Sequence, residues 1–273
     1  MNLDAYFARI RYAGPRVPTL PVLHDILFRH TCVIPFENLD VLLGRGVSLA
    51  DADVERKLVA ENRGGYCFEQ NSLLIRALLA LGFAVTPLSA RVRLNQPREF
   101  TPPRTHLLLR VTIDGVPWLA DVGIGGFSPA APLRLDVSDT EQPTAYDARR
   151  IVSESGSHGS RHFHQVKLGD AWADVYEFTG EEMPAIDREL ANWWTSTHPA
   201  SHFRHNLLVG LARPDGTRFG LTNREFVHRR GAEVLERVEI RTADELLMLL
   251  AERFGLRFPP GTRFGDGETA WPN

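Results

Sequence analysis

Three side chains in this sequence are placed where they could carry out nucleophilic acyl transfer: a cysteine, a histidine and an aspartate. Cys67 is one of only two cysteines, and it follows Gly64-Gly65 directly before a helical apolar run at residues 72–81. Backbone N–H groups and the dipole at a helix start favour an anion, which would make this thiol a better nucleophile. The two glycines allow a sharp turn and the close approach of a substrate.

The histidine and the aspartate belong to neighbouring strand-like runs. His106 begins the run 106–113, and Asp121 ends the next run, just before a glycine-rich loop. The dipeptide Asp114-Gly115 between them is a strong signal for a two-residue hairpin, which would bring His106 and Asp121 together. A thiol, an imidazole and a carboxylate that orients the imidazole are what cysteine acyl-transfer chemistry needs. Each residue alone could be structural, but their order and placement favour a triad with Cys67.

The chain resembles the arylamine N-acetyltransferases in segments that occur in the family's order. The stretch around Cys67, Arg63-Gly64-Gly65-Tyr66-Cys67-Phe68-Glu69-Gln70-Asn71, is very specific to that family, and the other segments are individually moderate. Those other segments are IPFENL at 34–39, THLLL at 105–109, DVGIGG at 121–126 and TSTHP at 195–199.

This resemblance implies a function and a set of site residues. Cys67, His106 and Asp121 would form the catalytic triad, acetyl-CoA would be the acetyl donor, and an arylamine, a hydrazine or an N-hydroxyarylamine would be the acceptor. The acetyl group would pass through a thioester on the cysteine. Substrate and cofactor contacts are expected at Phe36, Val92, Thr105, Ile124 and Gly125. Family members often carry an aromatic residue where Ile124 stands, so the acceptor preference is expected to be affected.

The resemblance also implies an α+β fold with a core like that of cysteine proteases and transglutaminases. A helical region carrying the cysteine is expected at 1–83. A mainly β, antiparallel barrel-like region carrying the histidine and aspartate is expected at 84–190, and a C-terminal α/β lid at 191–273. Hydrophobic periodicity predicts helices at 3–12, 20–30, 51–61, 67–82, 187–194 and 243–254. It predicts strands near 85–92 and at 106–113, 117–122, 163–168, 172–179, 219–229 and 234–240. Residues 129–160 read as loops joining short strands, and the tail after Pro259 as poorly ordered or draped on the surface.

Composition excludes several other classes of protein. The chain has 273 residues, 43% of them hydrophobic and 24% charged, and a formal net charge of −3. No general attraction to nucleic acid or an anionic membrane is expected from that charge. The sequence has no apolar run of about 18 residues and no signal-peptide pattern at its start. Two cysteines make no disulfide framework, so we expect a cytoplasmic protein with a free thiol.

Other candidate sites are weaker. His162 and His164 would share one face of a strand, and His198 and His202 have the spacing of metalloprotease helices. No third ligand is evident, so no metal is expected. Cys32 lacks the glycine turn and helix start of the other cysteine, so a buried structural role is expected.

Two alternative functions remain open from the sequence. A transglutaminase-like enzyme or a cysteine hydrolase would use the same order of triad residues, and a catalytically silent CoA-binding module would use none of them. The sequence leaves open the physiological acceptor, the acyl-chain length, the oligomeric state, the second oxyanion donor and the effect of Ile124 on acceptor choice.

Overall fold

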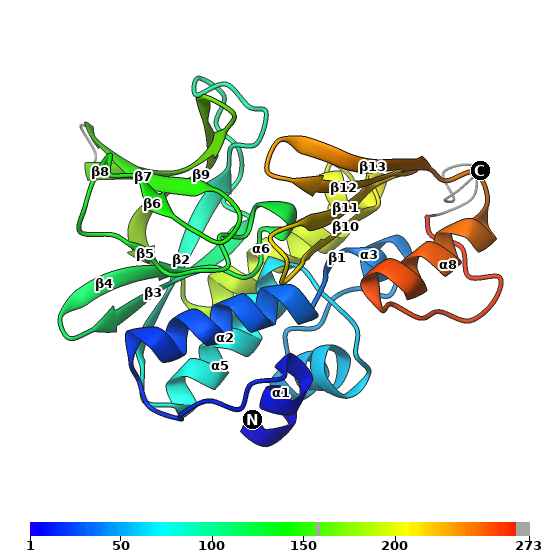
Figure 1. The fold of residues 1–273 in the computed structure, drawn as a ribbon, viewed down its shortest axis with the longest axis horizontal. Helices are drawn as coiled ribbons and strands as arrows, with labels where there is room; N and C mark the ends of the chain where they lie inside the picture. Colours follow the sequence, from blue (N-terminus) through cyan, green and yellow to red (C-terminus); the bar gives the residue numbers. More distant parts are fainter. Residues whose placement is uncertain (157–158, 266–273) are drawn as a thin grey trace.

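A layer of helices, a strongly curved sheet and a second, smaller sheet make up the protein (Figure 1). The computed structural model describes residues 1–156 and 159–265. Helices fill the N-terminal part, as predicted from the sequence. They are α1 (Leu3–Ile10), α2 (Leu20–Val33), α3 (Leu39–Leu42), α4 (Asp51–Glu55), which continues into the π-helical turn η1 (Arg56–Ala60), and α5 (Cys67–Ala80).

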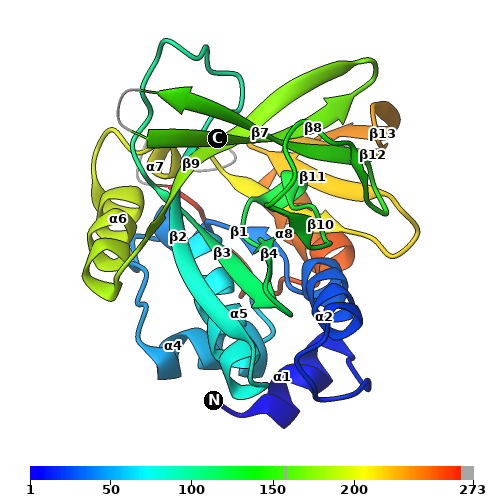
Figure 2. The ribbon, with the colours of Figure 1, turned by 90° about the vertical axis from the view of Figure 1, so that its left-hand side faces the viewer.

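Helix α5 is the central helix of this part. Most of its own side chains are buried. They include apolar residues such as Phe68 and Leu74 and also the polar residues Gln70 and Asn71. A helix buried all round lies inside the core rather than on its surface. It packs against the strands β2 (Ala84–Val92) and β3 (His106–Ile113), as Figure 2 shows. It also contacts α1 and α4, so the helix that carries the cysteine lies between the sheet and the other helices.

The large sheet is antiparallel and nearly closes on itself. Its strand order is β5-β4-β3-β2-β9-β8-β7-β6. The Gln142 side chain, on edge strand β6, hydrogen-bonds both the N–H and the carbonyl of Arg134 on edge strand β5, at 2.7 and 3.2 Å. The barrel-like region expected from the sequence is confirmed. Its remaining strands are β4 (Val116–Ala120), β5 (Leu133–Arg134), β6 (Gln142–Pro143), β7 (Ala148–Gly156), β8 (Gly159–Leu168) and β9 (Ala171–Glu182).

One prediction for the barrel is wrong. Residues 129–160 were expected to form loops and short strands, but β7 is a full strand paired with β8. The inward-facing positions of β7 include Arg149 as well as Ile151, both fully buried. A buried arginine disrupts the apolar alternation by which a half-buried strand is detected, so the segment looked like a loop.

The smaller sheet combines residues from both ends of the chain. Its order is β1-β10-β11-β12-β13, so β1 (Phe36–Glu37), from the helical part, forms one edge beside β10 (Leu208–Ala212). The strand expected at 219–229 is in fact a hairpin of β11 (Arg218–Thr222) and β12 (Glu225–Arg230), because Asn223 takes a left-handed conformation at the turn. Strand β10 was not predicted. The other elements of this part are α6 (Ala185–Thr197), α7 (His202–His205), β13 (Glu233–Glu239) and α8 (Ala243–Phe254).

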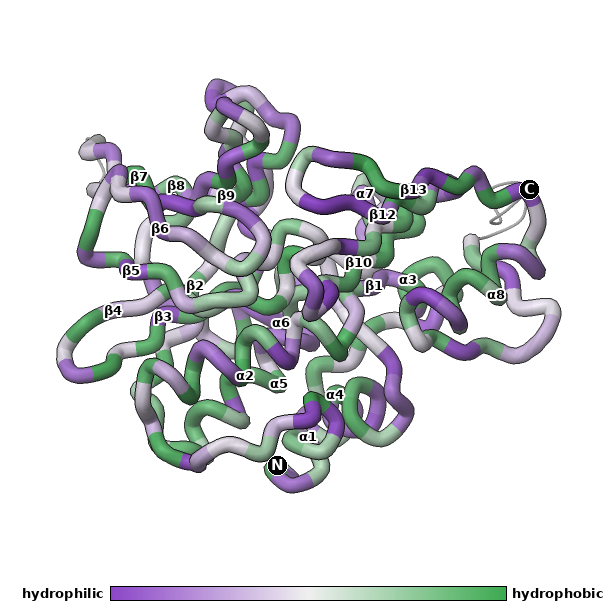
Figure 3. Tube along the Cα trace, in the orientation of Figure 1, coloured by the Kyte–Doolittle hydropathy of each residue, from purple (hydrophilic) through white to green (hydrophobic). Residues whose placement is uncertain are grey.

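Helix α8 covers this sheet with one face. Its bounds, Ala243–Phe254, agree with the predicted helix at 243–254. Thr242 and Glu245 form a capping box at its start, and Gly255 ends it in the left-handed conformation. The helix alternates between hydrophobic and hydrophilic stretches (Figure 3) and buries Leu246 and Leu250.

The segment after Pro259 differs from its prediction. Phe264 is fully buried with its ring 5.1 Å from that of Phe258, and the N–H of Gly265 donates to the carbonyl of Leu42 at 2.7 Å. An aromatic anchor therefore holds this segment in the core, which the Gly- and Pro-rich sequence around it concealed. Residues 266–273, which the same prediction covered, lie outside the described residues. Among the residues that the structure describes, no helix is long and apolar enough to cross a membrane.

Candidate active site

The Cys67 side chain lies at the first position of α5 and is 4% exposed. The glycines before it serve close packing within the protein. A Cβ on Gly64 would lie 2.2 Å from the carbonyl oxygen of Pro35, and one on Gly65 would lie 2.6 Å from Oε2 of Glu69. Neither glycine has a positive φ. The space beside these glycines, where the close approach of a substrate was expected, is thus occupied by Pro35 and Glu69 of the protein itself. This packing fixes the start of the helix.

His106 and Asp121 meet because of the hairpin between β3 and β4. Asp114 and Gly115 both have positive φ, as a two-residue hairpin turn requires, and they set the register that pairs Leu109 with Ala120. Asp121 comes next after Ala120, on the face that His106 shares. The Nε2 atom of His106 lies 2.8 Å from Oδ2 of Asp121, and both side chains are buried.

The thiol completes the arrangement. The Cys67 side chain lies close enough to the His106 imidazole to help raise the pKa of that ring, and its Sγ lies 3.6 Å from the backbone carbonyl oxygen of Thr105. Because Nε2 of His106 is engaged by Asp121, Nδ1 is the nitrogen left to exchange a proton with the thiol. The structure therefore brings a thiol, an imidazole and a carboxylate together in one buried site.

Sequence reasoning missed a role for Asn71. Its Nδ2 donates to Oδ1 of Asp121 at 2.9 Å and to the carbonyl of Leu107 at 2.7 Å, while its Oδ1 accepts from Val122 N–H at 3.2 Å. Asn71 stands four residues after Cys67, so both lie on the same face of α5. A polar residue on the same helix face as Cys67 was the feature of the sequence that could have indicated this role.

Charge within the site is balanced. Burial lowers the pKa of His106, but the Asp121 carboxylate and the Cys67 side chain outweigh it and raise this pKa to about 10. Burial raises the pKa of Asp121, but His106 and the hydrogen bonds from Asn71 and Gly123 outweigh it and hold this pKa below its usual value. The imidazole therefore stays protonated around neutral pH beside a carboxylate that stays ionised.

The predicted contact residues belong to several different elements of the fold. Phe36, on β1, packs against Gly125, since a Cβ on that glycine would lie 3.1 Å from the Phe36 ring. Ile124 is half-buried and packs against the apolar interior of the barrel. Val92 is half-buried at the end of β2, two residues beyond Ala90, the register partner of His106. Thr105 contributes the carbonyl described above.

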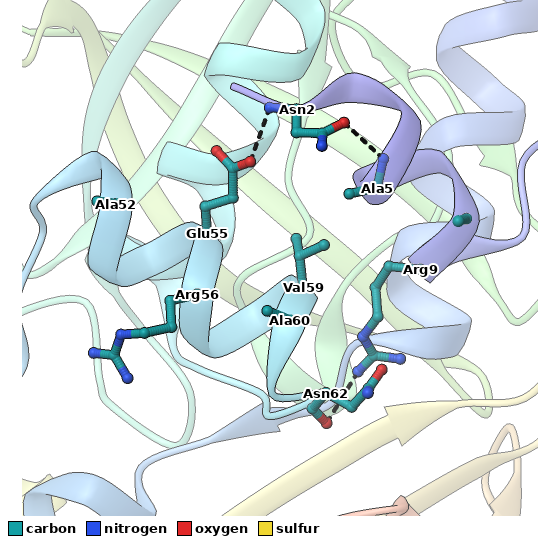
Figure 4. Close-up of a pocket in the computed structure, with 10 residues that line it drawn as sticks. Asn2, Ala5, Arg9, Ala52, Glu55, Arg56, Val59, Ala60 and Asn62 are labelled. Carbon is teal, nitrogen blue, oxygen red and sulfur yellow. Dashed lines mark hydrogen bonds between the residues drawn. The ribbon is translucent and has the colours of Figure 1, made fainter.

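Two hollows on the surface of the described residues differ in their distance along the chain from the site, and neither is lined by Cys67, His106 or Asp121. A hollow of about 340 Å³ includes Thr105 and lies between β9, α6 and the segment before β3. A larger one, of about 750 Å³, lies between α1 and the α4–η1 segment and includes none of the triad (Figure 4). Its wall is tied together by hydrogen bonds from Asn2 N–H to Glu55 and from Arg9 to the carbonyl of Asn62.

The histidines considered as metal ligands have other partners. His162 hydrogen-bonds Ser153, His164 lies 3.3 Å from Arg149, and His198 stacks on Trp194 with ring centroids 5.2 Å apart. Within residues 1–156 and 159–265, no three His, Cys, Asp or Glu side chains gather in a way that could hold a metal. Cys32 is buried, with Sγ 3.1 Å from the Tyr146 hydroxyl.

Comparison with known proteins defines the class. A family model described as N-acetyltransferase matches residues 19–261. An arylamine N-acetyltransferase of Escherichia coli (strain K12) is 41% identical over 93% of this chain and 88% of its own length. An arylamine N-acetyltransferase / N-hydroxyarylamine O-acetyltransferase of Salmonella typhimurium is 40% identical over the same shares.

Solved structures agree with the sequence comparisons. The structure of Mycobacterium marinum arylamine N-acetyltransferase in complex with CoA is similar with a TM-score of 0.86 and 38% identity, over 93% of this chain and 92% of that one. The chain therefore belongs to the arylamine N-acetyltransferase family.

Proposed function

We propose that this protein transfers an acetyl group from acetyl-CoA, through a thioester on Cys67, to the nitrogen of an arylamine or arylhydrazine or to an N-hydroxyarylamine. The observation that carries the proposal is the buried arrangement at the start of α5, in which the Cys67 thiol faces a His106 imidazole held by Asp121. The family membership of the chain and the CoA bound to the M. marinum relative support the donor.

In the first half-reaction, His106 holds the thiol proton at Nδ1, and the Cys67 thiolate attacks the thioester carbonyl of acetyl-CoA. The bond from Cys67 Sγ to the acetyl carbon forms, the bond from that carbon to the CoA sulfur breaks, and His106 returns the proton to the leaving thiolate. Backbone N–H groups at the first turn of α5, including that of Cys67, are suited to stabilise the oxyanion.

In the second half-reaction, the acceptor nitrogen attacks the acetyl group on Cys67. His106 accepts the proton that the nitrogen loses, and the Cys67 thiolate leaves. Asp121 stabilises the imidazolium in both halves and keeps its ring in one orientation, because Oδ1 of the carboxylate is itself fixed by Asn71 and Gly123 N–H.

The test is an intact-mass measurement after brief exposure to acetyl-CoA without amine. We expect about one equivalent of CoA released in a burst and the mass of one acetyl group on the peptide containing Cys67. An arylamine should then discharge the enzyme, and parallel double-reciprocal lines should appear in the steady state. Cys67→Ala should show no burst, whereas Cys32→Ala should behave as the unaltered protein.

Other results would identify the alternatives. Discharge by water as fast as by amine would indicate a hydrolase, and modification of a protein glutamine would indicate a transglutaminase-like enzyme. Absence of both burst and acetylated Cys67 would indicate a silent CoA-binding module and overturn the proposal.

We also propose a cytoplasmic location and small-molecule substrates only. Support comes from the two cysteines, of which neither is in a disulfide, and from the reactive role proposed for one of them, which requires a reducing compartment.

A further inference from the structure

Behind the loop that follows Asp121, a buried cluster joins the barrel to the smaller sheet. We call Asp147, Arg149 and Arg218 the arginine clamp. Arg149, on β7, is fully buried, and Arg218, the first residue of β11, is 7% exposed. Asp147 lies between them, and its Oδ2 accepts from Nη2 of Arg149 at 2.9 Å and from Nη2 of Arg218 at 3.1 Å. Two guanidinium groups thus share one carboxylate.

The remaining donors of the arginine clamp are directed at the backbone of one short loop. Arg218 Nη1 donates to the carbonyls of Gly126 and Ser128, at 2.9 and 3.0 Å. Arg149 Nη1 donates to the carbonyl of Phe127 at 2.7 Å. Three successive carbonyls are therefore held by charged donors, each of which is stronger than a neutral hydrogen bond. Leaving the buried carbonyl of Ser128 unsatisfied would cost free energy.

The held loop, residues 123–128, forms a wall beside the thiol. At one end, Gly123 approaches Cys67 so closely that a Cβ there would lie 2.6 Å from the Cys67 Cα. Further along, Gly125 packs against Phe36, and Gly126 N would lie 3.0 Å from a Cβ on Gly210 of β10. This loop also carries Ile124 and Gly125, two of the expected contact residues, so its position bears on which acceptors fit beside Cys67.

The hydrogen bonds that hold Asp121 do not come from the arginine clamp. They come from Asn71, on α5, and from the N–H of Gly123, at the end of the loop away from the clamped residues 126–128. The partners of Arg218 in the described part of the chain are the loop carbonyls, Asp147 and the Tyr146 ring. Arg149, by contrast, reaches His106 indirectly through the rings of His164 and Tyr176. Arg218 is therefore the residue whose removal should loosen the loop and spare the thiol.

We propose that Asp147, Arg149 and Arg218 are positioning residues that set acceptor selectivity by fixing the backbone of residues 126–128. The inference rests on the proposed function, because it concerns the second half-reaction of that scheme. It predicts that loss of Arg218 affects acceptors that fill the space beside the loop and spares an acceptor that does not.

The test separates the two half-reactions in Arg218→Met, Arg218→Lys and a control, Arg134→Met. Arg134 also pairs with an aspartate, Asp136, but that pair is exposed. Acetylation of Cys67 by acetyl-CoA is followed as CoA release. Discharge is then measured with hydrazine, which has no ring, and with a para-substituted aniline.

We expect Arg218→Met to affect CoA release and discharge to hydrazine much less than discharge to the substituted aniline. Discharge to the substituted aniline should slow by about 10-fold to 100-fold, mainly through a higher KM, since small misplacements of a binding wall have effects of that order. Arg218→Lys, which can still donate to a carbonyl, should recover part of the loss, and Arg134→Met should show no change.

The ratio of aniline to hydrazine discharge is measured within one sample, so it is independent of the fraction of protein that is folded. An unchanged ratio in both Arg218 variants would overturn the proposal. An equal loss in CoA release and in both discharges would also overturn it, by showing a role in general stability. If the unaltered protein fails to acetylate Cys67, the proposed function itself fails, and that outcome is visible before any variant is made.

Discussion

At the scale of single residues, the site depends on how completely Asp121 is held. Its two oxygens accept hydrogen bonds from His106, from Asn71 and from the N–H of Gly123. A carboxylate with these partners cannot rotate without breaking one of them, and a buried charge without partners is costly. The imidazole is consequently fixed with Nε2 toward the carboxylate and Nδ1 toward the thiol.

This arrangement predicts graded losses for two substitutions. Asp121→Asn should lower kcat/KM by about 10³-fold to 10⁴-fold, by analogy with the triad aspartate of serine proteases. Asn71→Ala removes one charge-assisted hydrogen bond, commonly about 1.5–3 kcal/mol, and should cost about 10-fold to 100-fold. The rates of acetyl transfer and of Cys67 alkylation by iodoacetamide below neutral pH measure both. Near-normal values for Asp121→Asn would mean that another group orients His106.

At the scale of elements, the loop after β4 lies directly against the start of α5. Gly123 of the loop faces both the main chain of Cys67 and the side chain of Asn71. A Cβ on Gly123 would lie 2.6 Å from Cys67 Cα and 2.7 Å from Nδ2 of Asn71. Main-chain atoms of a buried helix cannot yield as the tip of a flexible side chain can. The loop that carries Ile124 can lie beside the thiol only because residue 123 has no side chain.

Gly123→Ala should therefore displace the loop from α5. We expect a loss of about 1–3 kcal/mol in the free energy of unfolding, the usual cost of overpacking a core, and a clear loss of acetyl transfer. Urea denaturation and CoA release measure the two effects. Gly220→Ala is the matched control, because a Cβ there would come no closer than 4.0 Å to the Val227 carbonyl. Equal behaviour of the two variants would show that the close approach has no consequence.

At the scale of the whole molecule, three parts of the chain meet at the site. Cys67 comes from the helical part, His106 and Asp121 come from the barrel, and β1 and Arg218 connect both to the smaller sheet. We propose three domains, at 1–83, 84–190 and 191–273. Strand β1 belongs to the first of them and pairs with the sheet of the third. Folding of the three parts is thereby linked to assembly of the site.

The buried charges predict how stability depends on pH. The pKa of His106 is raised from 6.5 to about 10, because Asp121 and Cys67 outweigh the effect of burial. Below pH 6.5 both folded and unfolded chains hold this proton, so the stabilisation is fully present. As pH rises from 6.5 to about 10, the unfolded chain releases the proton first, and the stabilisation is lost.

The free energy of unfolding should therefore fall over that range in the unaltered protein, and it should fall less in His106→Gln. Urea denaturation of both proteins at a series of pH values measures the difference. Parallel curves would show that His106 does not retain its proton in the folded protein.

Local patterns in the sequence were enough to predict a site for acyl transfer. A cysteine directly after Gly64-Gly65 and before an apolar helix, and a histidine and an aspartate on either side of Asp114-Gly115, are local patterns. Helix starts and two-residue hairpins are set by short-range sterics and hydrogen bonds, so their residues reveal them without the rest of the chain. The α+β fold, by contrast, was implied by the resemblance of the surrounding segments to the arylamine N-acetyltransferases.

Only the tertiary structure decided which distant groups meet the site. Asn71 hydrogen-bonds Asp121, and Arg149 and Arg218 hydrogen-bond the carbonyls of residues 126–128. Strand β1 joins a sheet built mainly from residues after 207. A buried polar side chain takes whichever partner the packed chain brings to it, and no local pattern encodes that partner. An arginine inside a strand and a phenylalanine in a glycine-rich tail mislead a periodicity reading, because long-range packing overrides local preference there.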